Sequence, residues 1–152
     1  MAKILIIDDD PVIVDLLRLR LTQSGHQVAA AHDAYGAAAA AAQFKPDLVT
    51  LDFDLPAGSG VKILERLRGS TFTSATPVVF ITAMSPYDLE PLVPADPKIR
   101  FLQKPIDMPA LGKLMAELLG LPAPAIPPEV AAATPRPPDG GALGGDILDS
   151  KP

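Results

Sequence analysis

Five short apolar runs alternate along the chain with segments whose apolar residues recur at helical spacing, and this alternation constrains the fold most strongly. The runs predict strands at residues 3–7, 27–31, 47–51, 77–81 and 99–102. Strands separated by helices pair in parallel, because a parallel crossover needs a long connection, and the helices then cover both faces of the sheet. The sequence therefore predicts an α/β fold with a doubly wound, five-stranded parallel sheet.

Residues that favour helix ends mark the connections between these strands. Asp10 precedes a proline at the start of the first helical segment, and Asp33 and Asp107 can cap the second and the last. The fourth connection differs, because Ser85 can begin a helix but the prolines that follow each remove a backbone donor. We therefore expect a shortened fourth helix of about one to two turns, interrupted by Pro91, Pro94 and Pro97.

Polar side chains stand where the predicted strands end. Asp8 and Asp9 follow the first strand, Asp52 follows the third, Thr82 ends the fourth and Lys104 comes shortly after the fifth. In open α/β sheets ligands bind beyond the carboxyl ends of the strands, so these side chains should converge. Several carboxylates at one edge need a positive charge, and oxygen ligands without Cys favour Mg²⁺ over Zn²⁺. The sequence therefore predicts a magnesium site with a lysine beside it.

Four motifs carry a resemblance to a known family. They are ILIIDDDP at residues 4–11, LVTLDFDLP at 48–56, ITA at 81–83 and KP at 104–105. Their order and spacing, each at a strand end, resemble the receiver domains of bacterial response regulators, over residues 2 to about 120. The resemblance implies a flavodoxin-like fold with strand order 2-1-3-4-5.

The resemblance also implies a phosphoryl acceptor and a metal site. Asp52 would accept a phosphoryl group from a sensor histidine kinase or a phosphotransfer protein, in a Mg²⁺-dependent reaction. Asp9 and Asp52 would bind Mg²⁺ directly, Asp8 would bind it through water, and Asp54 would contribute its backbone carbonyl. Such a domain labels itself rather than turning over a substrate, so we do not expect an enzyme in the usual sense.

Further roles follow from the same resemblance. Thr82, the Ala83 backbone N–H and Lys104 would bind the phosphoryl oxygens. Phe101 matches the switch aromatic, which swings inward when the threonine moves, and Pro105 matches the cis proline of the family. Phe101 lacks the hydroxyl of the more usual tyrosine, so a switch at this position would work by packing alone.

Two alternatives to phosphorelay signalling stay open at this point. One is a receiver fold retained as an unphosphorylated docking module, although no acid, threonine or lysine of the motif is missing. The other is an aspartyl-nucleophile phosphohydrolase of the haloacid dehalogenase type, because Asp52 and Asp54 superficially resemble its Asp-x-Asp signature. That family places the signature on its first strand, whereas here it follows the third.

Composition excludes several classes of partner. A net charge of −5 argues against binding to a nucleic-acid backbone, which depends on Lys and Arg. No apolar stretch is long enough for a signal peptide or a membrane span, so we expect no membrane partner and a cytoplasmic location. The absence of Cys excludes disulfides and thiolate metal sites.

The composition changes near residue 121, and this change predicts two regions. We expect a receiver domain at residues 1–120 and a Pro/Ala/Gly-rich C-terminal tail, extended or disordered, at 121–152. The tail is too short for an output domain. The chain would therefore be a stand-alone receiver, or one excised from a longer protein, that signals through phosphorylation-dependent protein binding or onward phosphotransfer.

Overall fold

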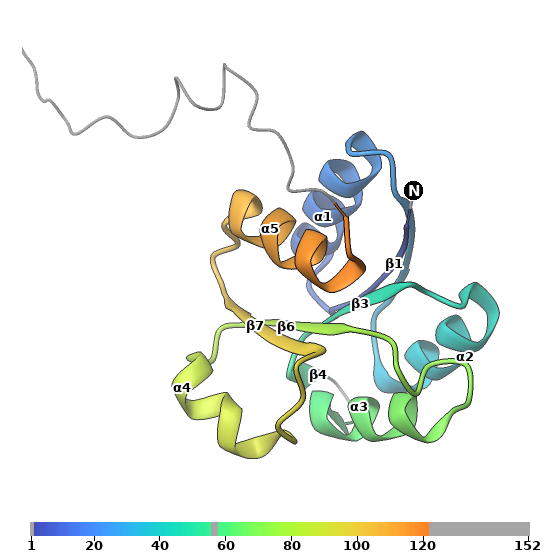
Figure 1. Cartoon of the computed structure of the whole chain (residues 1–152), viewed down its shortest axis with the longest axis vertical. Coiled ribbons are helices and arrows are strands. Elements are labelled where there is room, and N and C mark those ends of the chain that lie inside the picture. Colours follow the sequence, from blue (N-terminus) through green and yellow to red (C-terminus); the bar gives the residue numbers. More distant parts are fainter. Residues whose placement is uncertain (1, 56–57, 122–152) are drawn as a thin grey trace, which may run out of the picture.

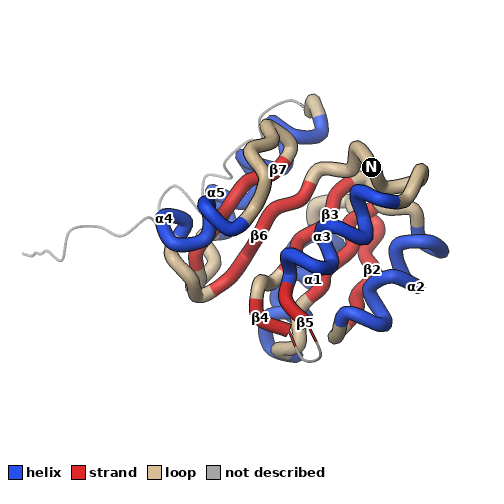
Figure 2. Tube along the Cα trace, turned by 90° about the horizontal axis from the view of Figure 1, so that it is seen from below, coloured by secondary structure: helices blue, strands red, loops and turns tan. Residues whose placement is uncertain are grey.

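A five-stranded parallel sheet forms the centre of the molecule in the computed structural model, which describes residues 2–55 and 58–121 (Figure 1). The strands lie in the order β2-β1-β3-β6-β7. Every neighbouring pair is parallel, and Figure 2 shows β2 and β7 at opposite edges. When only strands of this sheet are counted, this is the predicted order 2-1-3-4-5. Their bounds are β1 (Lys3–Ile7), β2 (Gln27–Ala31), β3 (Leu48–Leu51), β6 (Val78–Thr82) and β7 (Ile99–Gln103).

Helices cover both faces of the sheet, as the alternation of strands and helices predicts. α1 (Pro11–Gln23) and α5 (Met108–Leu119) lie on one face, whereas α2 (Ala34–Phe44) and α3 (Gly60–Gly69) lie on the other (Figure 1). Alternate residues of β1 contribute to the two cores: Ile4 and Ile6 pack with α1 and α5, and Leu5 and Ile7 pack with α2 and α3. Burial on both faces explains why the central strands are continuous apolar runs.

The predicted capping residues lie at the helix starts. The carboxylates of Asp10, Asp33 and Asp107 each accept a hydrogen bond from a backbone N–H in the first turn of the helix that follows. At the other end, Gly120 has φ +68°, a left-handed conformation that ends α5. The tail predicted at 121–152 lies outside the described residues, apart from Leu121.

The connection between β3 and α3 contains two further short strands. Asp54–Leu55 (β4) and Gly58–Ser59 (β5) pair antiparallel, and β4 begins two residues after Asp52. Two-residue strands carry no alternation of apolar and polar residues, so no sequence pattern could indicate them. Among the described residues, no helix is both long enough and apolar enough to cross a membrane.

The fourth helix is short, as predicted from the prolines. α4 (Pro86–Leu89) and the 3₁₀ turn η1 (Glu90–Leu92) are its only helical segments.

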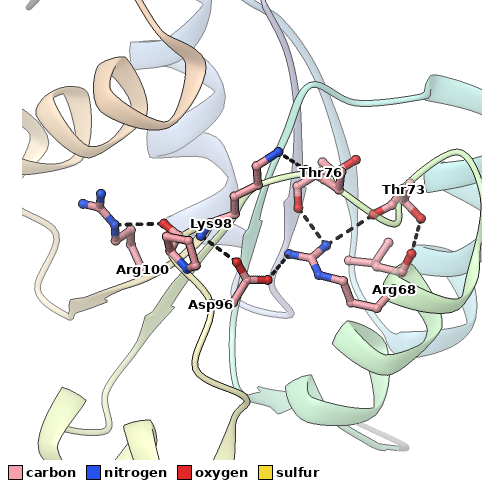
Figure 3. Close-up of polar contacts among 9 residues, drawn as sticks. Arg68, Thr73, Thr76, Asp96, Lys98 and Arg100 are labelled. Atoms are coloured by element: carbon pink, nitrogen blue, oxygen red, sulfur yellow. Dashed lines mark hydrogen bonds and ion pairs between the residues drawn. The ribbon is translucent and has the colours of Figure 1, made fainter.

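An irregular stretch leads from η1 to β7, and a cluster of polar contacts lies where this stretch enters β7 (Figure 3). Arg68 Nη1 donates to the carbonyls of Thr73 and Thr76 at 3.2 and 2.8 Å, and Nη2 lies 3.7 Å from Asp96 Oδ2. Lys98 Nζ donates to Ala75 O at 3.3 Å. These contacts join the α3–β6 loop to the segment that enters β7.

We predict that Arg68→Ala lowers the free energy of unfolding by about 1–3 kcal/mol, because two part-buried carbonyls lose a charged donor. Urea denaturation measures this change. Arg66→Ala, at an exposed position of the same helix, is the matched control and should change stability by less than about 0.5 kcal/mol. Equal effects of the two substitutions would show that the polar cluster does not stabilise the fold.

Candidate functional site

Three carboxylates meet at the carboxyl edge of the sheet. Asp8 and Asp9 follow β1, and Asp52 follows β3. Because β1 and β3 are neighbours with Ile7 opposite Leu51, the residues that follow them lie side by side. One oxygen from each of the three side chains lies within 4.8 Å of the others. Asp8 and Asp52 are buried, at 2% and 7% exposure, whereas Asp9 is exposed.

Lys104 places its ammonium group between the two buried carboxylates. Its Nζ lies 3.0 Å from Asp8 Oδ2 and 3.2 Å from Asp52 Oδ2. The other oxygen of each carboxylate accepts a backbone N–H two residues further on, from Asp10 at 2.9 Å and from Asp54 at 3.2 Å. Each buried carboxylate therefore has one contact with Lys104 and one with the backbone of its own loop.

The pKa values of this group reflect burial and charge together. Burial raises the pKa of Asp8 above its ordinary value, although the Asp10 amide and the Lys104 ammonium act in the opposite direction. Burial alone would lower the pKa of Lys104, but its contacts with Asp8 and Asp52 outweigh that effect and raise it. Lys104 therefore stays protonated. One ammonium beside three carboxylates leaves an excess of negative charge, which suits a further cation.

Thr82 and the residues after it form the next side of the site. Thr82 is the last residue of β6 and is buried. Its Oγ1 accepts a long hydrogen bond of 3.5 Å from the backbone N–H of Met84. The backbone N–H of Lys104 donates to Thr82 O at 2.9 Å, so the two strands stay joined at their ends. Gln103 Nε2 donates to Ala83 O at 3.1 Å, a contact that the sequence motifs do not indicate.

The remaining predicted residues lie around this centre. Phe101 is half-buried and stacks on Phe80, with ring centroids 5.9 Å apart and an interplanar angle of 12°. The peptide bond between Lys104 and Pro105 is cis. Asp54 lies in β4 with an exposed side chain. The ligand role proposed for its carbonyl stays a prediction.

Gly60 is a second residue that the sequence analysis missed. Its N–H donates to Phe53 O at 2.6 Å. A Cβ at this position would lie 2.7 Å from Asp52 O and 2.9 Å from Phe53 Cα, both backbone atoms. The start of α3 therefore approaches the Asp52 loop so closely that no side chain fits between them. A glycine at the start of a helix gave no sign of this contact, which depends on the folded loop.

Comparison with known proteins decides the family. The sequence profile of the response regulator receiver domain matches residues 4–116. The chain belongs to this family. The family and the β2-β1-β3-β6-β7 sheet both argue against the haloacid dehalogenase alternative, because Asp52 follows the third strand of the chain.

Several curated response regulators are similar to this receiver domain. It is 43% identical over 84 residues to RpaA, a DNA-binding dual master transcriptional regulator of Synechocystis sp. (55% of this chain, 35% of that protein). It is 43% identical over 83 residues to the transcriptional regulatory protein KdpE of Mycobacterium tuberculosis (55% and 35%). Protein PilH of Pseudomonas aeruginosa is 39% identical over 82 residues (54% and 68%). The chain therefore spans about a third of the first two relatives.

Solved structures show the same fold. The chemotaxis protein CheY4 of Vibrio cholerae is 27% identical, with a TM-score of 0.70 over 78% of this chain and 99% of that one. The receiver domain of the sensor histidine kinase PA1611 from P. aeruginosa is 20% identical, with a TM-score of 0.69 over 78% of this chain and 98% of that one. That crystal structure has a magnesium ion coordinated in its active site cleft.

We predict that Gly60→Ala destabilises the receiver domain by about 1–3 kcal/mol, because the added methyl group overlaps backbone atoms of the Asp52 loop. Thermal or urea unfolding measures the loss. Gly69→Ala is the control in the same helix, since a Cβ there meets nothing within 4 Å. This control should be neutral or stabilising by up to about 1 kcal/mol. Equal stability of the two variants would contradict the close approach at Gly60.

Proposed function

We propose that this receiver domain accepts a phosphoryl group on Asp52 and signals through the phosphorylated form. The arrangement of Asp52 carries the proposal: its carboxylate is buried beside two other acids, with Lys104 on one oxygen and a backbone N–H on the other. A carboxylate fixed in this way can act as a nucleophile. The lysine beside it can neutralise charge that develops on a transferred phosphoryl group.

The chemistry requires one bond to form and one to break. An oxygen of Asp52 attacks the phosphorus of a phosphohistidine on a sensor kinase or phosphotransfer protein. The P–N bond breaks, imidazole leaves with its electron pair, and an acyl phosphate remains on Asp52. Lys104, the Thr82 hydroxyl and the Ala83 N–H then bind the phosphoryl oxygens. Phosphoryl transfer needs this positioning and charge neutralisation more than covalent assistance.

The donor set fits a magnesium ion. Asp8, Asp9 and Asp52 bring three carboxylate oxygens within 4.8 Å of one another, and one lysine does not neutralise them. Hard oxygen donors of this kind select Mg²⁺. Asp9 and Asp52 would bind it directly, Asp8 through water and Asp54 through its carbonyl. When bound, the ion supplies charge neutralisation between the acceptor and the incoming phosphoryl group. The magnesium in the PA1611 receiver domain supports this proposal.

The output we propose is phosphorylation-dependent protein binding or onward phosphotransfer. DNA binding is part of the printed description of RpaA, but the match covers only 35% of that protein, so this activity is not carried over. We propose that the domain labels itself and does not turn over a substrate. An unphosphorylated docking module is less well supported, because a complete set of acids, lysine and threonine has no use in it.

We predict that acetyl phosphate and Mg²⁺ add one phosphoryl group to the wild-type protein and none to Asp52→Asn, since the amide is a poor nucleophile. Intact mass spectrometry measures the product. The control Asp15→Asn, on the exposed side of α1, should label like the wild type. Labelling of Asp52→Asn at the wild-type level would move the acceptor to another residue. Absence of labelling in the wild type would favour the docking module.

Asp54 gives a prediction about charge at the site. Its carboxylate adds negative charge near the proposed metal site before phosphorylation, but faces a group of about −2 charge afterwards. At about 6 Å and an effective dielectric near 20, each unit of charge contributes roughly 3 kcal/mol before solvent and salt reduce it. We predict that Asp54→Asn weakens Mg²⁺ binding about two- to fivefold, and strengthens binding of the phosphoryl mimic beryllofluoride at saturating Mg²⁺ by a similar factor.

Titrations monitored by fluorescence or calorimetry measure both constants for Asp54→Asn. Asp88→Asn, which removes an exposed charge in α4, is the control for a general effect of net charge. If both constants of Asp54→Asn lie within about twofold of the wild type, or roughly 0.4 kcal/mol, its side chain has no part in the site.

A further inference from the structure

The peptide unit between Ala83 and Met84 is hydrogen-bonded at both ends. Its carbonyl accepts from Gln103 Nε2 at 3.1 Å, and its N–H donates to Thr82 Oγ1 at 3.5 Å. A continuous chain of hydrogen bonds therefore runs from the exposed Gln103 amide, through one peptide unit, to the buried Thr82 hydroxyl. Each bond in such a chain polarises the next and restricts the rotation of the groups that it joins.

The Gln103 side chain adds one contact between β6 and β7 beyond their last backbone hydrogen bond. It stands opposite Thr82 in the β6–β7 register, and the N–H of Lys104 makes the last backbone bond to Thr82 O. The loop begins at Ala83, where backbone pairing between the strands has ended. The Gln103 side chain reaches beyond that point and keeps the first loop carbonyl beside β7.

We propose that Gln103 is a positioning residue for the phosphoryl-binding loop, an inference that rests on the proposed function of Asp52. A hydroxyl has one hydrogen to donate and can also accept. Because the Met84 N–H occupies an acceptor position of Thr82 Oγ1, the Thr82 hydrogen stays available for a phosphoryl oxygen. Fixing the Ala83 carbonyl also limits the orientations of residue 83, whose N–H is the other proposed donor. Donors fixed before the group arrives need no reorganisation when it binds.

Substitution of Gln103 distinguishes an effect on the phosphoryl-binding loop from an effect on the metal site. Gln103→Met keeps a side chain of similar length but removes the donor. Mg²⁺ affinity should stay at the wild-type value, because the carboxylate ligands do not contact Gln103. Beryllofluoride binding at saturating Mg²⁺ should weaken about two- to fivefold, since an exposed hydrogen bond lies at the low end of its usual range. Gln43→Met, at an exposed position of α2, is the matched control and should leave both constants unchanged.

A double-mutant cycle tests the route through Thr82. If Gln103 acts by orienting the Thr82 hydroxyl, Gln103→Met should weaken beryllofluoride binding less in a Thr82→Ala background than in the wild type. Amide exchange of Met84 should also become faster in Gln103→Met. A substitution that only lowered the stability of the fold would give no coupling between Gln103 and Thr82. It would also not weaken beryllofluoride binding while leaving Mg²⁺ affinity unchanged.

The outcomes distinguish this inference from the function on which it rests. A wild-type protein that binds neither Mg²⁺ nor beryllofluoride overturns both. If the wild type binds both ligands, three results each overturn the role of Gln103 alone. These are beryllofluoride affinity of Gln103→Met within about 1.5-fold of the wild type, tighter binding in that variant, or full additivity with Thr82→Ala.

Discussion

The ion pairs of Lys104 with Asp8 and Asp52 are the interaction on which the rest of the site depends. Two buried carboxylates side by side repel each other in a medium of low dielectric, and burial of each charge has its own cost. The Lys104 ammonium group, at 3.0 Å from Asp8 Oδ2 and 3.2 Å from Asp52 Oδ2, offsets their mutual repulsion and the cost of their burial. Because the three residues follow β1, β3 and β7, the same contacts join the carboxyl ends of three strands.

The sequence was sufficient to predict the sheet, because its central strands are buried on both faces and are continuous apolar runs. The convergence of the carboxylates was also predictable, because Asp8 and Asp52 directly follow such runs and the strand order implied by the family resemblance makes these strands neighbours. Their backbone partners were not predictable. The N–H groups of Asp10 and Asp54 bond to these carboxylates because of local loop geometry, which no residue type fixes.

The contacts that sequence analysis missed share a physical cause. Gly60 is required by backbone atoms that approach it in space, and Gln103 bonds to a carbonyl on a neighbouring strand. Arg68 bonds to carbonyls of a loop with no regular structure. None of these contacts repeats with the period of a helix or a strand, so only the folded arrangement identifies them.

Irregular connections before and after β6 explain why such contacts gather around β6 and β7. The α3–β6 loop and the connection through α4 and η1 both contain irregular stretches, whose backbone groups need partners from elsewhere. Side chains supply some of them at both edges of the sheet. At the amino edge, Arg68 lies near Asp96 and Lys98 bonds to the α3–β6 loop (Figure 3). At the carboxyl edge, Gln103 bonds to Ala83. The connection from β6 to β7 is thus held at both ends, and its first residues, at the carboxyl edge of the sheet, are among those proposed to contact the phosphoryl group.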